Sequence, residues 1–304
     1  MLFGIQPFLS PVETATAQYL LDVYSSGPRY AFGLSRLISG YSGDIITVRR
    51  DTDGTTQNFG LVGDELDQAA IIDFVTQSGA FPAANGYVSE WFSQVNNVSI
   101  EDKGGLITEL PKIVDAGSVI TEGGKIATEW DGGDNLQDDF SGALGAGVTE
   151  FTQATVYNHT GPDNVERTVL VDGLNTNDFV RISETPAQSA LFEVSRNASG
   201  NIVYNAGAAD AYNGRVTSVL VTTPQGASST TGGFANSIGY TNAGGFGDAP
   251  LNDIGRALYV GGTDGGGNTS SNSLAGTIQL IVAWVNDYNS DSANIRDFID
   301  NNIL

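Results

Sequence analysis

The stretch Asp44-Ile-Ile-Thr-Val-Arg-Arg-Asp51 decides the fold of this chain. Its isoleucines, threonine and valine are β-branched, and such residues favour an extended strand. The turn Asp53-Gly54-Thr55 then leads the chain back into Asn58-Phe-Gly-Leu-Val62. Two apolar runs joined by a short turn that contains Asp-Gly are typical of a β-hairpin.

A helix is expected after this hairpin, because apolar residues recur at helical spacing from Leu66 to Phe74. Asp64 stands just before the pattern and is a candidate N-cap. Gly79 and Pro82 mark its end.

The second half of the chain carries short strand signals separated by glycine or asparagine turns. They lie at 148–157, 167–171, 178–182, 190–194, 201–204, 215–222 and 256–260. Gly123-Gly124 marks a further hairpin between two apolar runs. Regular short strands with turns between them predict a mainly β fold, either a sandwich or a jelly roll.

One more strand and a closing helix complete the pattern. Residues 274–284 are apolar on both faces toward their end, which predicts a central strand. Residues 291–303 place isoleucines on one helical face, with Asp291 as the candidate N-cap. A shorter helix is expected near the N-terminus, over residues 13–24.

The chain contains 35 acidic and 13 basic residues, which gives a net charge of -22, and it contains no cysteine. A surface this acidic repels phosphate backbones, so we expect no nucleic-acid partner. No disulfide and no thiolate metal site can form. Because no apolar run reaches the roughly 18 residues of a membrane span, and no signal peptide is visible, we expect a soluble protein that stays in the cell that makes it.

The domain organisation is predicted to be simple. Residues 1–28 form an N-terminal arm and helix, and residues 29–304 form one β domain without repeats or a sharp linker. Residues 1–12, the arm, contain two prolines. Two interpretations stay open: the arm docks on a neighbouring subunit, or it lies along its own domain. The Gly/Ser/Thr/Asn-rich region 222–253 fits both disorder and a long functional loop.

Several stretches resemble a known family. They are Tyr30-Ala-Phe-Gly-Leu-Ser-Arg-Leu37, Tyr41-Ser-Gly-Asp-Ile-Ile-Thr-Val-Arg-Arg50, Val88-Ser-Glu-Trp-Phe-Ser-Gln94 and Gly124-Lys-Ile-Ala-Thr-Glu-Trp-Asp-Gly-Gly-Asp134. They resemble the concanavalin A-like lectin/glucanase (LamG-like) domain that is related to the catalytic domain of α-L-arabinofuranosidase B. The resemblance covers most of residues 30–304 and is most specific in its first third.

This resemblance implies a concanavalin A-like jelly-roll sandwich, with an N-terminal arm or helix and a short C-terminal helix. Many such domains belong to bacteriophage virion proteins. Members of the enzyme family carry a run like Tyr-Asp-Gln-Ser-Gly-Asn-Gly where this chain has Trp91-Phe-Ser-Gln-Val-Asn-Asn97. Ser93 replaces the aspartate and both turn glycines are absent, which favours a sandwich without the enzyme's active site.

Retaining glycoside hydrolysis needs two carboxyl groups about 5 Å apart. Asp264 lies in Gly261-Gly-Thr-Asp-Gly-Gly-Gly267, which resembles the loop that carries the acid of the enzyme family, one residue out of step. Glu129, near a strand end, is the other candidate. No counterpart of the nucleophile is found in the middle of the chain, so we expect no catalytic pair.

Three aspartates in one acidic loop, Asp131, Asp134 and Asp138, offer the oxygen ligands that Ca²⁺ prefers. Their spacing is not that of an EF-hand loop, and a solvated acidic loop is the alternative. We therefore expect no cofactor, with Ca²⁺ as the candidate metal at this loop.

Carbohydrate binding uses aromatic faces beside polar groups, and four residues are candidates: Tyr240, Phe246, Trp91 and Trp130. The two tryptophans fit the interior of a sandwich as well, since aromatic residues dominate such cores. Tyr240 and Phe246 lie in the glycine-rich region and are the better candidates for a surface.

Together these features favour a non-enzymatic structural protein of a bacteriophage virion, as a head decoration or a tail or fibre component. Residues 1–12 are expected to contact other virion subunits, the chain to form a homo-oligomer, and host surface glycans to be its ligands. The alternative is an arabinofuranosidase-like glycoside hydrolase. A carbohydrate-binding module of a cellular protein is a third interpretation.

Overall fold

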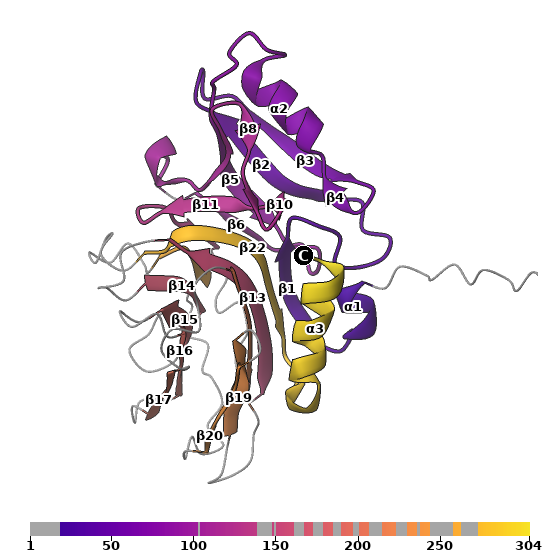
Figure 1. Ribbon diagram of the computed structural model, residues 1–304, viewed down its shortest axis with the longest axis vertical. Coiled ribbons are helices and arrows are strands. Elements are labelled where there is room, and N and C mark those ends of the chain that lie inside the picture. Colours follow the sequence, from indigo (N-terminus) through magenta and orange to yellow (C-terminus); the bar gives the residue numbers. More distant parts are fainter. Residues whose placement is uncertain are drawn as a thin grey trace, which may run out of the picture.

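The chain folds into one curled antiparallel β-sheet whose two halves form two layers (Figure 1). The computed structural model describes residues 19–102, 104–138, 148, 150–160, 258–262 and 273–304. Between 167 and 243 it describes the strands 167–172, 179–184, 190–196, 201–206, 215–222, 230–235 and 238–243. The prediction of a mainly β fold with a short C-terminal helix is confirmed.

The first layer is built from antiparallel neighbours, each of which pairs with the next. Their spatial order is β3 (Thr56–Val62), β2 (Asp44–Arg50), β5 (Gly86–Phe92), β6 (Ser99–Glu101), β12 (Leu136–Gln137), β21 (Leu258–Val260), β14 (Arg167–Asp172), β15 (Phe179–Glu184), β16 (Ala190–Arg196) and β17 (Asn201–Ala206).

The second layer is organised around β22 (Ala275–Trp284), which confirms the prediction of a central strand. One edge of β22 pairs with β13 (Phe151–His159), and its other edge pairs with β1 (Pro28–Gly33) and β11 (Thr128–Asp131). Beyond β13 follow β18 (Arg215–Thr222), β19 (Thr230–Ala235) and β20 (Ile238–Ala243). The region 222–253, predicted as a loop, therefore contains two strands, because its few β-branched and aromatic residues pair with β18 and with each other.

Short elements join and close the layers. β7 (Lys112–Asp115) pairs with both β5 and β11, so the sheet is continuous from one layer to the other. The remaining short elements are β4 (Glu65–Leu66), β8 (Ser118–Val119), the hairpin β9 (Thr121–Glu122) and β10 (Lys125–Ile126), and the 3₁₀ turns η1 (Ile107–Glu109) and η3 (Asn289–Asp291). The hairpin turns at Gly123-Gly124, as predicted.

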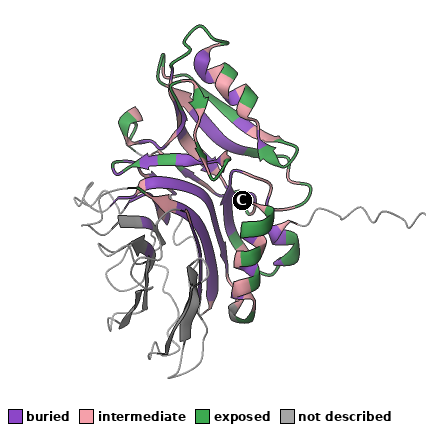
Figure 2. Cartoon of the chain, in the orientation of Figure 1, coloured by how far each residue is buried: buried purple, intermediate pink, exposed green. Residues whose placement is uncertain are grey.

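Two apolar cores hold the layers. The larger one lies between them and takes Ile46, Trp91 and Ile100 from the first layer and Ile278 and Ile281 from the second. Figure 2 shows β13 and β22 buried almost along their whole length. Strands that bury both faces carry near-continuous apolar runs, which is the pattern of residues 274–284.

The second core lies on the outer side of β22, under α1 (Leu20–Val23) and α3 (Ser292–Asn302). Leu20, Ile295 and Ile299 pack there with Trp284, whose indole N–H donates to the carbonyl of Tyr24 at 2.8 Å. The segment just before β1 thus packs on the sandwich. The domain boundary at residue 28 stays a prediction, and residues 1–18 lie outside the described residues.

The hairpin at 44–62 is confirmed, but the helix after it begins later than predicted. α2 (Gln68–Thr76) is capped by Asp67, whose carboxylate accepts the N–H of Ala70 at 3.0 Å. Asp64 instead pairs with Arg36 at 2.9 Å. The chain stays extended through β4 because β4 pairs with β3, so the helix starts only at Gln68. No helix among the described residues is long and apolar enough to cross a membrane.

A pair of glycine substitutions tests the packing between the layers. Gly261 and Gly124 have left-handed φ values of +84° and +83°, so alanine costs about 1–2 kcal/mol at either position. A Cβ at Gly261 lies 2.1 Å from the Trp130 ring, whereas a Cβ at Gly124 meets no atom within 4 Å.

We expect Gly261→Ala to lower the free energy of unfolding by about 1–3 kcal/mol more than Gly124→Ala, since overpacking adds to the backbone cost. Urea denaturation of both variants measures this difference. Equal losses for the two variants would contradict the contact between Gly261 and Trp130.

Candidate functional site

A row of polar residues crosses the solvent-facing side of the first layer. The strand register places the residues of this polar row directly opposite one another: Asn58 on β3, Thr47 on β2, Glu90 on β5, Glu101 on β6, Gln137 on β12 and Tyr259 on β21. Residues that lie directly opposite in antiparallel strands project from the same face of a sheet. The polar row therefore forms a stripe across five strand boundaries.

The residues next to the polar row point the other way. Each of these core-facing residues is completely buried: Ile46, Trp91, Ile100, Leu136 and Val260. In the row itself, Asn58 and Glu101 are exposed, Glu90, Gln137 and Tyr259 are partly buried, and Thr47 is buried. From Glu90 to Tyr259 the row thus lies on a more open polar face, opposite the completely buried residues.

Glu90 and Glu101 are the centre of the polar row, because they form a directly opposed pair. The Cβ atoms of such pairs lie about 4.5–5.5 Å apart, and like charges in this arrangement destabilise a sheet. A retaining glycosidase needs two neighbouring carboxyl groups, one to attack the anomeric carbon and one to donate a proton.

The Thr47 hydroxyl lies between Asn58 and Glu90. The Thr47 hydroxyl lies 2.9 Å from Oδ1 of Asn58 and 3.4 Å from Oε2 of Glu90. Nδ2 of Asn58 donates in turn to Oδ2 of Asp44 at 2.8 Å. A chain of polar groups thus runs along the row from the edge strand β3 to the carboxyl pair.

Glu129 has a different setting from the one predicted for a catalytic group. It lies on β11 opposite Lys112, with 3.9 Å between Oε2 and the Lys112 Nζ, and its side chain is 48% exposed. Lys112 makes its shorter ion pair with Asp115, at 2.8 Å, and this bond raises the pKa of Lys112. The register places no second carboxylate opposite Glu129, so it is a solvated charge beside the polar row.

Asp134 carries the most strongly perturbed carboxyl group of the predicted site. It is 3% exposed, and its burial raises its pKa to about 7. The N–H of Asp131 donates to Oδ2 at 2.7 Å and acts in the opposite direction, while the charges of Asp131 and Glu129 raise the pKa further. A carboxyl group with such a pKa suits proton transfer, but its burial closes it to a substrate.

The predicted Ca²⁺ loop uses its carboxylates to hold the backbone. Asp131 accepts the N–H of Gly133 at 2.8 Å, and Asp138, which is 2% exposed, accepts the N–H of Leu258 at 2.9 Å. Among the residues that the structure describes, no group of three or more His, Asp or Glu side chains is placed to hold a metal ion. Asp131, Asp134 and Asp138 therefore hydrogen-bond to the backbone of turns and strands, and a Ca²⁺ site at this loop stays a prediction.

Two of the predicted sugar-binding aromatics are corrected. Trp91 is 0% and Trp130 1% exposed, and the Trp130 indole donates to the Thr128 hydroxyl at 2.9 Å. Both rings fill the core between the layers and offer no face to a ligand. Tyr240 lies on β20, where its backbone pairs with Gly233; its side chain lies outside the described residues, as do Phe246 and Asp264.

The described residues on either side of Asp264 lie next to the polar row. β21, which contributes Tyr259, is followed directly by Gly261, whose carbonyl accepts the N–H of Leu274 at 2.7 Å. The two ends of residues 263–272 therefore meet beside β21.

The run from Trp91 to Asn97, where this chain departs from the arabinofuranosidase pattern, is structural. Ser93 Oγ accepts the N–H of Ala31 at 2.9 Å, and Gln94 Oε1 accepts the N–H of Leu37 at 2.8 Å. Asn96 and Asn97 adopt left-handed φ values of +61° and +51°. Asparagine tolerates this region better than most residues, so the turn is preserved although both glycines are absent.

The opposition of Glu90 and Glu101 is not predicted from the sequence. Each lies at a solvent-facing position of a short extended segment, and a carboxylate at such a position is a signal that the sequence contains. Their pairing requires β5 and β6 to form a hairpin. The local sequence does not predict that Asn96-Asn97 is the turn of this hairpin.

Comparison with known proteins supplies a likeness of fold. No family model and no curated protein matches the sequence. An arabinofuranosidase complexed with arabinofuranosyl-α-1,2-xylobiose is 13% identical with a TM-score of 0.64, and the match covers 92% of this chain and 64% of that one. A GH54 α-L-arabinofuranosidase soaked with a cyclic sulfate inhibitor is 14% identical, with the same TM-score and coverage.

A weaker match is the CBM40 module of a Ruminococcus gnavus sialidase bound to α2,3-sialyllactose. It is 17% identical, with a TM-score of 0.39 over 49% of this chain and 83% of that one. The chain spans 64% of the length of the arabinofuranosidases that it matches. At this level of identity the similarity shows the fold.

The prediction that the chain is not an enzyme is contradicted. Solved structures that share its fold over 92% of the chain are arabinofuranosidases. The resemblance to a concanavalin-like domain related to arabinofuranosidase is supported at the level of fold. Nothing in these comparisons points to a bacteriophage.

The buried Asp134 gives a prediction for stability against pH. Its pKa is about 7 in the folded chain and near its ordinary 3.8 when unfolded. The folded state therefore binds more protons between these values, and this group makes the free energy of unfolding fall as pH rises from about 4 to about 7.

Asp134→Asn removes this ionisation but keeps an oxygen that accepts the N–H of Asp131. We expect the variant to gain stability relative to the original chain above pH 7, by up to roughly 4 kcal/mol, with little gain at pH 4. Chemical denaturation at several pH values measures this. A difference that does not depend on pH would contradict the raised pKa.

Proposed function

We propose that this chain is a glycoside hydrolase that acts on α-L-arabinofuranosides, with Glu90 and Glu101 as its two catalytic carboxyl groups. The observation that carries the proposal is the directly opposed carboxyl pair on the open face of the first layer. The fold shared with arabinofuranosidases supports the substrate class.

The chemistry follows from the geometry of the pair. One carboxylate attacks the anomeric carbon, and the glycosidic bond breaks as the other carboxyl group donates a proton to the leaving oxygen. Water, deprotonated by the second group, then hydrolyses the glycosyl ester and restores both carboxyl groups. Thr47, Gln137 and Tyr259 flank the pair and supply hydrogen-bonding groups for the sugar hydroxyls.

The assay is release of 4-nitrophenol from 4-nitrophenyl α-L-arabinofuranoside. We expect Glu90→Gln and Glu101→Gln each to lower the rate at least about 100-fold, because each removes a proton-transfer or nucleophilic step. Each change also removes a like-charge contact, so we expect the free energy of unfolding to stay the same or rise, by up to about 1 kcal/mol. Asp73→Asn, an exposed change on α2, is the matched control and leaves the rate unchanged.

Asp264→Asn distinguishes this assignment from the one based on resemblance. If Asp264→Asn abolishes hydrolysis while both glutamate variants keep it, the catalytic groups lie in the loop at 263–272 and not in the polar row. A folded original chain that cleaves no arabinofuranoside overturns the proposal as a whole.

The location in a bacteriophage virion stays a prediction from the sequence, together with the contact of residues 1–12 with other subunits, the homo-oligomer and host glycans as ligands. Residues 1–12 lie outside the described residues. Copurification of the chain with purified particles tests the location independently of any hydrolytic activity.

A further inference from the structure

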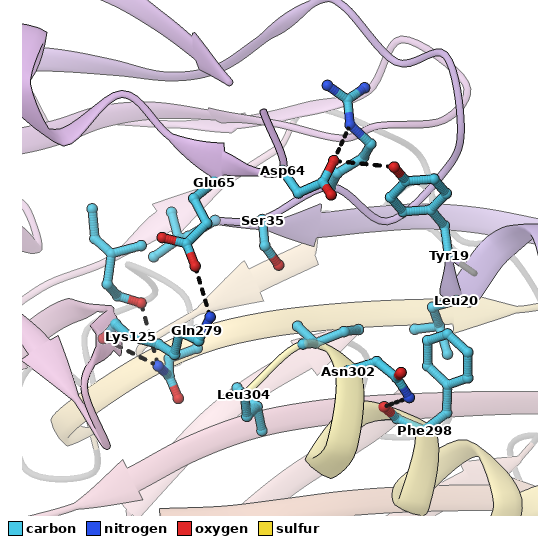
Figure 3. Close-up of a pocket in the computed structure, with 14 residues that line it drawn as sticks. Tyr19, Leu20, Ser35, Asp64, Glu65, Lys125, Gln279, Phe298, Asn302 and Leu304 are labelled. Atoms are coloured by element: carbon cyan, nitrogen blue, oxygen red, sulfur yellow. Dashed lines mark hydrogen bonds and ion pairs between the residues drawn. The ribbon is translucent and has the colours of Figure 1, made fainter. Parts of the chain in front are cut away.

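A pocket of about 340 Å³ lies away from the polar row, between α1, α3, β4 and the hairpin β9–β10 (Figure 3). None of the residues that line it belongs to the polar row. Pockets that bind small molecules have volumes from about 300 Å³ upward and combine apolar walls with a few placed polar groups.

A defect in the pairing of β22 opens this pocket. On one edge of β22, β1 ends at Gly33 opposite Leu280, and β11 begins at Thr128 opposite Ile278. Gln279 between them pairs with neither strand, and on the other edge it is the extra residue of a β-bulge against β13. Bulges occur preferentially next to functional sites.

Gln279 also fixes one wall of the pocket. Its side-chain amide lies within hydrogen-bond distance of three carbonyl oxygens of the hairpin β9–β10, at 3.1 Å from Glu122, 3.4 Å from Lys125 and 3.3 Å from Ile126. The hairpin is thereby held against β22, and Lys125 and Ile126 face the pocket.

The charges in the pocket are paired with each other. Figure 3 shows Glu65 and Lys125 on one side and Asp64 and Tyr19 on another. Lys125 lies 2.6 Å from Glu65, and Oδ1 of Asp64 accepts from Tyr19 at 3.1 Å and from Arg36 at 2.9 Å. Two cationic and two carboxylate side chains line the pocket, so the lining side chains together carry no net charge.

The rest of the lining is amphipathic. Ser35 and Asn302 add neutral polar groups, while Leu34, Ile126 and Phe298 supply apolar and aromatic surface. A ligand that matches such a lining is neutral, carries several hydroxyl groups and has an apolar face. A monosaccharide unit has these properties, since its hydroxyls bond carboxylates and its C–H face packs on apolar side chains.

We propose that this pocket is a second carbohydrate site, which binds one neutral monosaccharide unit. The site is separate from the carboxyl pair and does not depend on whether the chain is a hydrolase. It gives the chain a second point of attachment on a glycan.

Saturation-transfer NMR on the full chain tests this, with L-arabinose, D-xylose and D-galactose as probes and D-glucuronate as the charged comparison. We expect at least one neutral sugar to bind with a Kd in the millimolar range, more tightly than the uronate. Ser35→Phe fills the pocket and is expected to weaken this binding at least 10-fold. Ser118→Phe, on the exposed strand β8, is the matched control and leaves it unchanged.

Ile303→Trp fills the pocket from α3 and replaces Ser35→Phe if that variant does not fold. Binding that persists in a folded pocket-filled variant, binding of the uronate alone, or binding of no sugar overturns the proposal. The arabinofuranoside assay separates the two sites: Ser35→Phe is expected to keep the hydrolytic rate. If Ser35→Phe loses sugar binding and hydrolysis together, the pocket is part of the hydrolytic site and not a second site. If the original chain binds a sugar in the pocket but hydrolyses no arabinofuranoside, only the proposed function is wrong.

Discussion

The pairing of β22 on both edges is the constraint on which the rest of this structure depends. β13 follows one edge from Gly276 to Trp284, and β1 and β11 share the other edge. A strand in this position satisfies its backbone groups on both edges. Its side chains are apolar on both faces toward its end, and both faces are buried. Its outer face therefore needs α1 and α3, and its inner face needs the first layer, so the sandwich and its helices follow from one strand.

The same pairing sets the positions of the two sites. β7 joins β11 to β5, and β5 carries Glu90 into register with Glu101. The pocket lies where β1 stops and β11 begins along β22, because two strands that share one edge leave a residue unmatched between them. Both sites are consequences of strand register, and neither lies at a position that a local motif marks.

Much of the fold could be predicted from local pattern. β-branched runs and Gly turns located the hairpins, and the apolar run at 274–284 identified the central strand. Register could not be predicted, since it depends on pairings between segments far apart in the chain, such as β12 with β21. For that reason the local sequence points to Asp131, Asp134 and Asp138, which cluster in one acidic loop, and does not point to Glu90 and Glu101. Trp91 and Trp130 were ambiguous for a related reason: alternation along one strand does not say which of its faces is the core.

The measurement that tests the account most directly is a crystal structure of the Glu101→Gln variant soaked with 4-nitrophenyl α-L-arabinofuranoside. The substitution slows turnover and leaves the neighbouring register intact, so the ligand should persist where it binds productively. The account predicts a furanose ring over β5 and β6, with its anomeric carbon beside the Glu90 carboxylate. A ring bound productively at the loop of residues 263–272, with Glu90 out of reach of the anomeric carbon, would contradict it.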